Sequence, residues 1–214
     1  MKPLIVEIDV SQGPESPCAN GGWQLHSFAR NKFVTDVDPD EYVGNYDRAT
    51  GDVTPATDDL KAKLAAGLAF WLSYFEHGDG QWSLKGEGQQ CRFDGTKLAG
   101  ILVWEEGEEF APKKEEREAH ARRFLEAYSE WANGYVYDWS VREPGSDDPI
   151  ESVAETIGTD DMMKSIVELV GDRPIIARGD CKWMLTDRNG LYAGKTFEVM
   201  DEEDLVESLL ADDE

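Results

Sequence analysis

Negative charge is concentrated in four segments of this 214-residue chain, and this segregation constrains the fold more than any single motif does. The segments cover residues 36–52, 105–118, 143–161 and 198–214, and their formal charges are −5, −4, −7 and −9. The other residues are close to neutral, although the whole chain carries −24. Because charged side chains are almost never fully buried unless they are paired, these segments are expected at the surface, and the neutral remainder must supply the core.

The neutral remainder has enough apolar side chains for a core. Hydrophobic residues make up 40% of the chain and aromatic residues 10%, including 7 Trp, whereas disordered chains lack such bulky residues. The hydrophobic start is interrupted by Glu7 and Asp9, and no apolar run approaches the roughly 20 residues that span a bilayer. We therefore expect a soluble cytoplasmic protein that does not engage a membrane.

Hydrophobic periodicity predicts two main helices. Thr57 is a typical N-cap residue, and apolar side chains then recur at helical spacing, which predicts a helix over residues 58–76 that stops at Gly78. The same spacing predicts a second helix over residues 114–132. Each helix would turn one apolar stripe toward a sheet.

Runs of aromatic, β-branched and alternating residues predict the strands of that sheet. The expected strands cover residues 3–10, 22–34, 98–104 and 135–141, with shorter candidates near 82–84 and 90–93. Strands and helices in this order predict an α+β fold, with two main helices packed on a mixed or mostly antiparallel sheet. We assign this main domain to residues 1–144.

The residues after an expected loop at 143–149 form a smaller region. Its patterns predict helices over residues 160–170 and 202–210 and strands over 173–179, 181–187 and 197–200. About 65 residues are marginal for an independent core. We therefore expect residues 150–214 to be a small acidic α/β subdomain that docks on the main domain.

A set of short motifs runs through residues 1–144. In chain order they are Glu15-Ser16-Pro17, the aromatic and basic residues Trp23, Phe28, Arg30 and Phe33, Glu76-His77-Gly78, Cys91 with Asp94, Gly100-Ile101-Leu102, and Asn133 to Tyr137. In this combination the chain resembles a family of uncharacterised proteins encoded by bacteriophages, archaeal viruses and related mobile elements. The resemblance implies a viral origin and a place in the host cytoplasm, but no chemistry. It ends after Glu143, where a segment of the Cys-Trp-Gly-Phe type is absent.

Three residues of these motifs have the chemistry of a nucleophilic site. In such a site the imidazole of His77 would raise the thiolate fraction of Cys91, and the carboxylate of Asp94 would orient the ring. This constellation would make the protein a Cys/His-dependent hydrolase or transferase. The same residues are also compatible with a core cysteine, a histidine that caps a helix and an aspartate in a turn. Catalysis is therefore the alternative function.

No motif predicts a cofactor. Asp36, Asp38 and Asp40 have the alternating carboxylate spacing with which calcium loops begin. However, Glu41 stands at the sixth position, where such loops need glycine, and Asp47 at the twelfth, where they need a bidentate glutamate. A loose cation contact at the three aspartates is the metal alternative.

The acidity itself points to a protein partner. It excludes direct nucleic-acid binding, because phosphate contacts depend on cationic side chains. Duplex DNA with 24 charges is about 40 Å long, and a compact chain of this length is about 44 Å across. We infer a non-enzymatic viral accessory protein that mimics nucleic acid in the basic groove of a host nucleic-acid-binding protein, as a counter-defence inhibitor of the anti-CRISPR or anti-restriction type. The expected contact residues are Asp147, Asp148, Asp160, Asp161, Asp201, Glu202, Glu203 and Asp204.

The acidity is also compatible with a need for solubility and with a high-salt host. Strong charge keeps proteins dispersed, and acidic surfaces are general in hosts of that kind. The protein would then be a structural or host-takeover component, with its charges spread evenly over the surface. No sequence feature indicates an oligomeric state.

Overall fold

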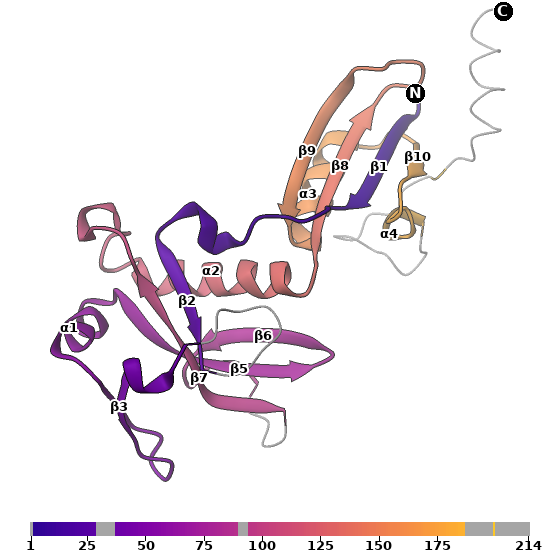
Figure 1. The fold of residues 1–214 in the computed structure, drawn as a ribbon. Helices are drawn as coiled ribbons and strands as arrows, with labels where there is room; N and C mark the ends of the chain where they lie inside the picture. The colour runs from indigo at the N-terminus through magenta and orange to yellow at the C-terminus, as the bar shows by residue number, and fades with distance from the viewer. Residues whose placement is uncertain (1, 29–36, 90–93, 187–198, 200–214) are drawn as a thin grey trace, which may run out of the picture. The chain divides into compact units, whose positions relative to one another are not determined.

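A computed structural model describes residues 2–28, 37–89, 94–186 and 199 of the chain (Figure 1). Helices and strands are mixed along the described sequence, and nearly all strand pairs are antiparallel. The predicted α+β fold class is therefore confirmed.

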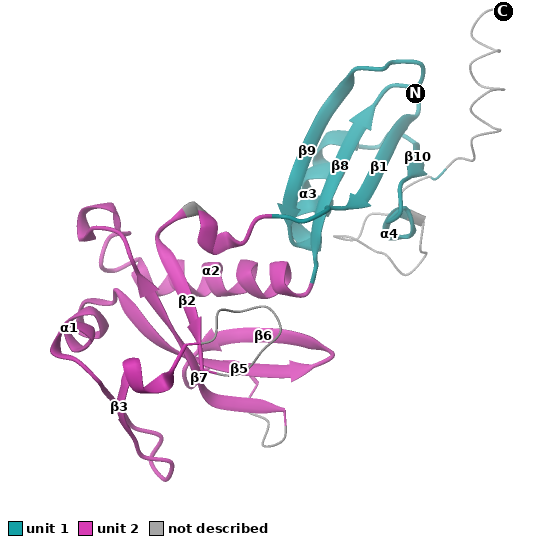
Figure 2. Cartoon of the chain, viewed as in Figure 1, with its two compact units in different colours: residues 1–14, 134–214 teal, residues 15–133 magenta. Residues whose placement is uncertain are grey.

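The described elements gather in two compact units, which Figure 2 shows in different colours. The central unit comprises residues 15–133, and the terminal unit combines residues 1–14 with residues 134–214. This division differs from the expected boundary near residue 144. The reason is that the strand Val136–Arg142 pairs with the first strand of the chain and with a strand that begins at Pro149. Sheet hydrogen bonds thus unite the two ends of the sequence.

The central unit is built on a four-stranded antiparallel sheet in the order β2-β7-β5-β6. The strands are β2 (Trp23–Ser27), β5 (Ala69–His77), β6 (Asp79–Leu84) and β7 (Gly95–Trp104). The main core packs Leu72 and Leu102 of the sheet against Leu125 of helix α2 (Arg117–Ala132). The predicted helix over 114–132 is thereby confirmed.

Smaller elements complete the central unit. They are the 3-10 helices η1 (Pro17–Asn20), η2 (Pro39–Glu41) and η3 (Glu108–Phe110), the helix α1 (Asp58–Ala66) and a hairpin of β3 (Val43–Tyr46) and β4 (Val53–Pro55). Leu60 of α1 packs with Ile101 and Val103 of β7 in a second, smaller cluster. The sheet is therefore apolar on both faces.

The predicted helix over residues 58–76 is wrong beyond Ala66. Helix α1 ends there because Gly67 adopts the left-handed conformation, with φ 72° and ψ 26°, which glycine tolerates best. The remaining residues form β5, where Leu72 belongs to the main core and Ala69 to the smaller cluster. Because β5 is apolar on both faces, it lacks the polar alternation that marks a strand, and its spacing also matched a helix.

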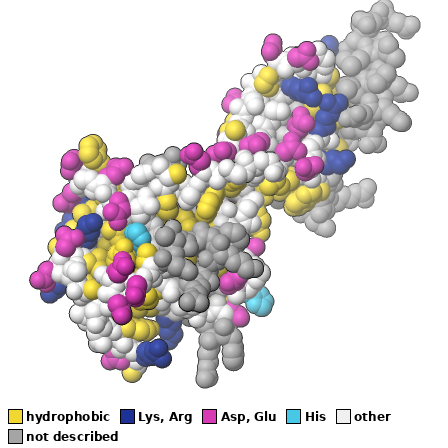
Figure 3. Space-filling view, viewed as in Figure 1, with side chains coloured by type: hydrophobic (Ala, Val, Ile, Leu, Met, Phe, Trp, Pro, Cys, Tyr) yellow, Lys and Arg dark blue, Asp and Glu magenta, His cyan; other side chains and the backbone are white. Residues whose placement is uncertain are grey.

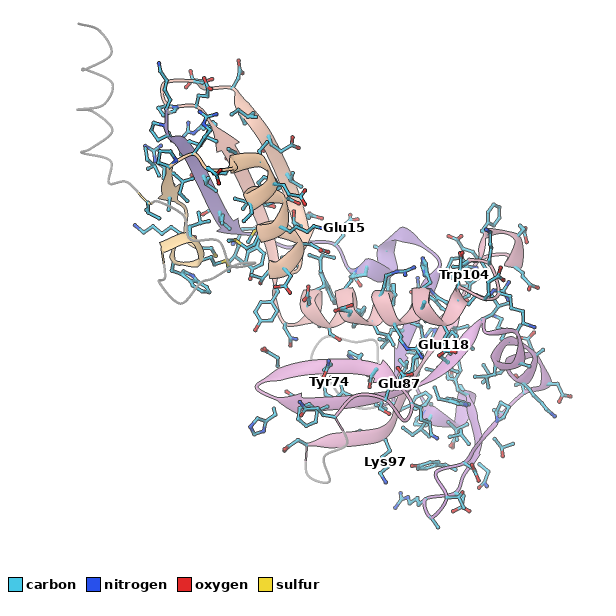
Figure 4. The ribbon with its side chains drawn as sticks, turned by 180° about the vertical axis from the view of Figure 1, so that it is seen from behind. Glu15, Tyr74, Glu87, Lys97, Trp104 and Glu118 are labelled. Atoms are coloured by element: carbon cyan, nitrogen blue, oxygen red, sulfur yellow. The ribbon has the colours of Figure 1, made fainter. Side chains whose placement is uncertain are left out.

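The terminal unit is a four-stranded sheet in the order β10-β1-β8-β9. Its strands are β1 (Leu4–Val10), β8 (Val136–Arg142), β9 (Pro149–Ile157) and β10 (Ile175–Arg178), and its helices are α3 (Thr159–Val170) and α4 (Trp183–Thr186). The β1–β10 pair is parallel and the other two pairs are antiparallel. Helix α3 covers one face of this sheet, as the rear view in Figure 4 shows, and packs Met162 and Ile166 against Ile8.

Several predictions for the terminal unit are confirmed and others are not. The strands expected over 3–10 and 135–141 and the helix over 160–170 are present as β1, β8 and α3. The strand predicted over 181–187 is wrong, because the short helix α4 lies there. Strand β9 was not predicted, since it is largely exposed and has no regular apolar pattern. The elements expected over 90–93 and 202–210 lie outside the described residues.

Candidate functional site

One stretch of the terminal unit combines strong negative charge with exposed secondary structure. Residues 143–172 contain nine acidic residues and a single basic one, Lys164. They form the turn after β8, then the edge strand β9 and helix α3. Because Gly158 connects β9 directly to α3, the helix folds back beside the strand (Figure 1).

Seven of these acids mark out a surface that we call the acidic edge. Its residues are Asp147, Asp148, Glu151, Glu155, Asp160, Asp161 and Glu168. The first two precede β9 and Asp160 follows it, so the edge has the length of this nine-residue strand, about 27 Å. Glu168 adds a carboxylate from α3, on the side of the helix that adjoins β9.

The acidic edge has no counter-ions among the described residues. All seven side chains are exposed, and none is within 4.0 Å of a basic group in that part of the chain. By contrast, Glu87 and Glu118 of the central unit, labelled in Figure 4, both accept hydrogen bonds from Arg122. Unpaired exposed carboxylates contribute little to folding and repel one another. Ion pairing within the described residues therefore does not account for the acidic edge.

The structure places four of the eight predicted contact residues on this edge. Asp147 and Asp148 lie at one end of β9, and Asp160 and Asp161 lie at the other end, so the two pairs do not form one cluster. Asp201, Glu202, Glu203 and Asp204 lie outside the described residues. The contact role of these four residues thus stays a prediction. Figure 3 shows acidic side chains on each of the two units.

Asp160 and Asp161 also have a role within the fold. They occupy the first turn of α3, where the helix dipole favours negative charge. The residue at the N-cap position is Gly158, which provides no side-chain hydrogen bond. Neutralising these two aspartates would weaken α3 itself, so the other acids are better probes of binding.

The proposed nucleophilic site is described only in part. His77 Nδ1 lies 3.5 Å from Asp94 Oδ2, and 78% of the His77 side chain is exposed. His77 ends strand β5, so its interpretation as a helix cap is wrong. Cys91 lies outside the described residues, and the Cys/His enzyme therefore stays an alternative.

Asp38 has a local structural role. Its Oδ1 accepts a 3.0 Å hydrogen bond from the backbone N–H of Asp40 and thereby caps η2. Asp36 lies outside the described residues. Within the described ranges, no three His, Cys, Asp or Glu side chains are placed to hold a metal ion.

Two histidines to which the sequence assigned no role contact aromatic rings. His120 Nδ1 accepts a 2.9 Å hydrogen bond from Nε1 of Trp23. Burial, aided by the charge of Arg123, lowers the pKa of His120. His26 stacks on Tyr42, with ring centroids 5.2 Å apart. These contacts join residues far apart in the sequence, so no local pattern could have revealed them.

Two further findings come from the helices of the structure and from comparisons with known proteins. None of the helices in the described residues combines the length and the apolar composition that crossing a membrane requires. Comparisons with models of protein families, with curated proteins and with solved structures find no match.

Proposed function

We propose that this protein binds a basic surface of another protein through the acidic edge, and that this surface is one that otherwise holds nucleic acid. The observation that carries the proposal is the row of seven exposed carboxylates without described counter-ions. Such a row repels itself in the free protein and gains favourable interactions when a cationic surface approaches.

The density of charge on the acidic edge supports this kind of partner. One strand of B-DNA carries a phosphate every ~3.4 Å, and hence about eight phosphates over 27 Å. The acidic edge presents seven carboxylates over a similar length. A groove that holds one nucleic-acid strand offers Lys and Arg in rows along the backbone, and a row of carboxylates complements it.

Occupation of such a groove would exclude nucleic acid from it. We therefore propose that the protein is a viral accessory protein that inhibits a host defence of the CRISPR or restriction type. The family resemblance of residues 1–144 supports the viral setting, and the acidic edge supports the mode of action. Electrostatic steering would make association fast and sensitive to salt.

The test is capture of partners from a lysate of host cells by the tagged protein, with elution by a salt gradient or by duplex DNA. The acidic-edge variant D147N/D148N/E151Q/E155Q should release its partner at lower salt than the wild type does. The control D52N/E109Q/E115Q/E126Q changes the charge equally, at exposed acids of the central unit that form no ion pair with a described residue. This control should release the partner at the same salt concentration as the wild type does.

Elution by duplex DNA at constant ionic strength would show that the protein and nucleic acid compete for one surface. If the acidic-edge variant retains its partner at the same salt concentrations as the wild type, the proposed function is wrong.

The contact between His77 and Asp94 favours the Cys/His enzyme as a second candidate. In that enzyme His77 would raise the thiolate fraction of Cys91, so iodoacetamide should alkylate Cys91 more slowly in H77A than in the wild type at pH 7. Equal alkylation rates would remove this candidate.

A further inference from the structure

A groove of about 460 Å³ lies between β9 and α3 in the terminal unit. Its lining residues are Trp139, Glu151, Val153, Ser165, Glu168 and Leu169. Trp139 is buried and Val153 is partly buried, whereas Leu169 is 37% exposed. Glu151 comes from the strand and Glu168 from the helix, so an apolar surface has a carboxylate on each side.

Strand β9 forms the outer edge of the sheet beside this groove. It pairs with β8 on one side, and no other described strand pairs with it. Most of its residues are exposed. Edge strands present unpaired backbone N–H and C=O groups, to which an extended peptide can add as a further strand.

We infer that the edge of β9 and this groove bind an extended basic segment of a partner protein. The segment adds as a strand next to β9 and places an apolar side chain in the groove, while its Lys or Arg side chains meet Glu151 and Glu168. The inference rests on the proposed function and names how the acidic edge engages its partner.

Only a short part of the β9 edge can pair regularly with a further strand. Pro149 begins β9, and Glu155 has a positive φ of 54° next to a shift in the β8–β9 register. Proline cannot donate a ladder hydrogen bond, and a bulge interrupts regular pairing. A second shift in register lies at Ile150, so the regular stretch is Glu151–Val153, to which a short segment of the partner can pair.

Charge selects a basic segment over the other possible occupants. Glu151, Glu155 and Glu168 have no basic partner among the described residues. A second copy that paired through its own β9 would bring glutamates of the two strands together, and like charges on neighbouring strands destabilise a sheet. Lys or Arg residues on the face of the incoming strand that meets the groove remove this repulsion, and an apolar residue two positions away, on the same face, supplies the apolar contact.

The experiment measures binding of a labelled ten-residue peptide to the full chain by fluorescence anisotropy. The probe has lysine and valine in turn at every second position, with threonine between them, so that both kinds of side chain lie on one face of the strand. One comparison peptide has proline in place of two threonines, which keeps the charge and the valines but removes ladder hydrogen bonds. Another has glutamate in place of lysine. We expect the lysine–valine probe to bind at least about tenfold more tightly than either comparison peptide.

Variants then locate the site. E151Q/E168Q removes the two carboxylates of the groove, and L169S removes an exposed apolar wall, so each should weaken probe binding about three- to tenfold. The control E115Q/E126Q makes the same charge change as the first variant, on the central unit. It should bind the probe as the wild type does. Unchanged circular dichroism and melting temperatures would show that the variants fold.

The outcomes separate this inference from the proposed function. If the proline peptide binds as tightly as the probe, or if E151Q/E168Q and L169S both bind it normally, strand addition in the groove is wrong. The proposed function would survive that result if D147N/D148N/E151Q/E155Q still releases its partner at low salt. Sedimentation that shows a dimer broken by L169S would assign the groove to a second copy and overturn the inference.

Discussion

The indole of Trp23 donates a 2.9 Å hydrogen bond from Nε1 to Nδ1 of His120, and this bond ties β2 to α2 across 97 residues of sequence. Trp23 is almost completely buried. An indole N–H can only donate, so His120 must offer an unprotonated Nδ1. Burial lowers the pKa of His120, and the nearby charge of Arg123 acts in the same direction.

The first prediction concerns the pH dependence of the central unit. Because the folded protein holds His120 with a lowered pKa, the unfolded chain binds more protons as the pH falls below about 6.5, the usual histidine pKa. The contribution of His120 to stability is therefore present above pH 6.5 and is lost as the pH falls through the lower folded value. Urea unfolding of the wild type and H120Q at pH 7.5 and 5.5 measures this contribution. The stability difference between the two proteins should shrink at pH 5.5, and an equal difference at both values would contradict the role of His120.

The second prediction concerns Arg117, whose side chain is only 8% exposed. Its guanidinium donates to the carbonyl oxygens of Ala66 at 2.8 Å and Pro112 at 2.9 Å, and to the carboxylate of Glu108 at 3.1 Å. R117A should lower the free energy of unfolding by about 2–4 kcal/mol, because it leaves two carbonyls without their donor. E108Q should cost under about 1 kcal/mol, since Glu108 is largely exposed. Equal costs in chemical denaturation would refute this assignment.

The third prediction concerns Gly100 in the centre of β7. A Cβ atom at this position would lie 2.4 Å from the backbone oxygen of His26 on the neighbouring strand. G100A should therefore lower the free energy of unfolding by about 1–3 kcal/mol, because backbone atoms of two paired strands must separate. An unchanged denaturation midpoint would mean that β2 and β7 do not pair in the register that places Ser27 opposite Gly100.

The fourth prediction concerns the attachment of β9. Trp139 in β8 donates from Nε1 to Oγ1 of Thr156 at 3.0 Å, and Trp139 is buried. T156V keeps the shape of the side chain but removes the acceptor, which should cost about 1–2 kcal/mol and speed amide hydrogen exchange in β9. T156S keeps the hydroxyl and should restore slow exchange. Fast exchange in both variants would show that the methyl group of Thr156, not its hydroxyl, holds the strand.

The fifth prediction separates the acidic-edge proposal from adaptation to high salt. Screening relieves repulsion among the charges of this −24 chain, and the Debye length is already ~3 Å at 1 M salt. If the edge serves binding, the melting temperature should rise with NaCl and level off near about 1 M. A melting temperature that still rises steeply from 1 M to 3 M would favour adaptation to a high-salt host instead.

Local patterns predicted those elements whose environment matches one simple rule. Helix α2 has one apolar stripe, and β1 and β8 turn alternate residues toward one core, so periodicity located all three. Strand β5 contributes to two cores and therefore resembled a helix. Strand β9 contributes little to either face, so it resembled a loop.

The charge of the candidate site could be predicted from the sequence, but its geometry could not. Asp147 and Asp148 lie in a segment without basic residues, which is visible in the sequence. Glu151 and Glu168 both line the groove, and they lie near each other only because α3 folds back beside β9. Trp139 is buried, and its place in the lining of the groove follows from pairing between strands.

The central position of β1 in its sheet has a consequence for the order in which the protein is made. The residues of its parallel partner β10 are synthesised 171 positions after the β1 residues with which they pair, whereas the central unit contains all the strand partners of its own sheet. On the ribosome, the central unit can therefore fold before β8 and β10, the strand partners of β1, have been synthesised. The chain also leaves and re-enters the terminal unit at adjacent points, since Ser11 N–H donates to the carbonyl of Val136 at 2.9 Å. The central unit is thus an insertion that a short turn could replace, which would give the terminal unit a continuous path from β1 into β8.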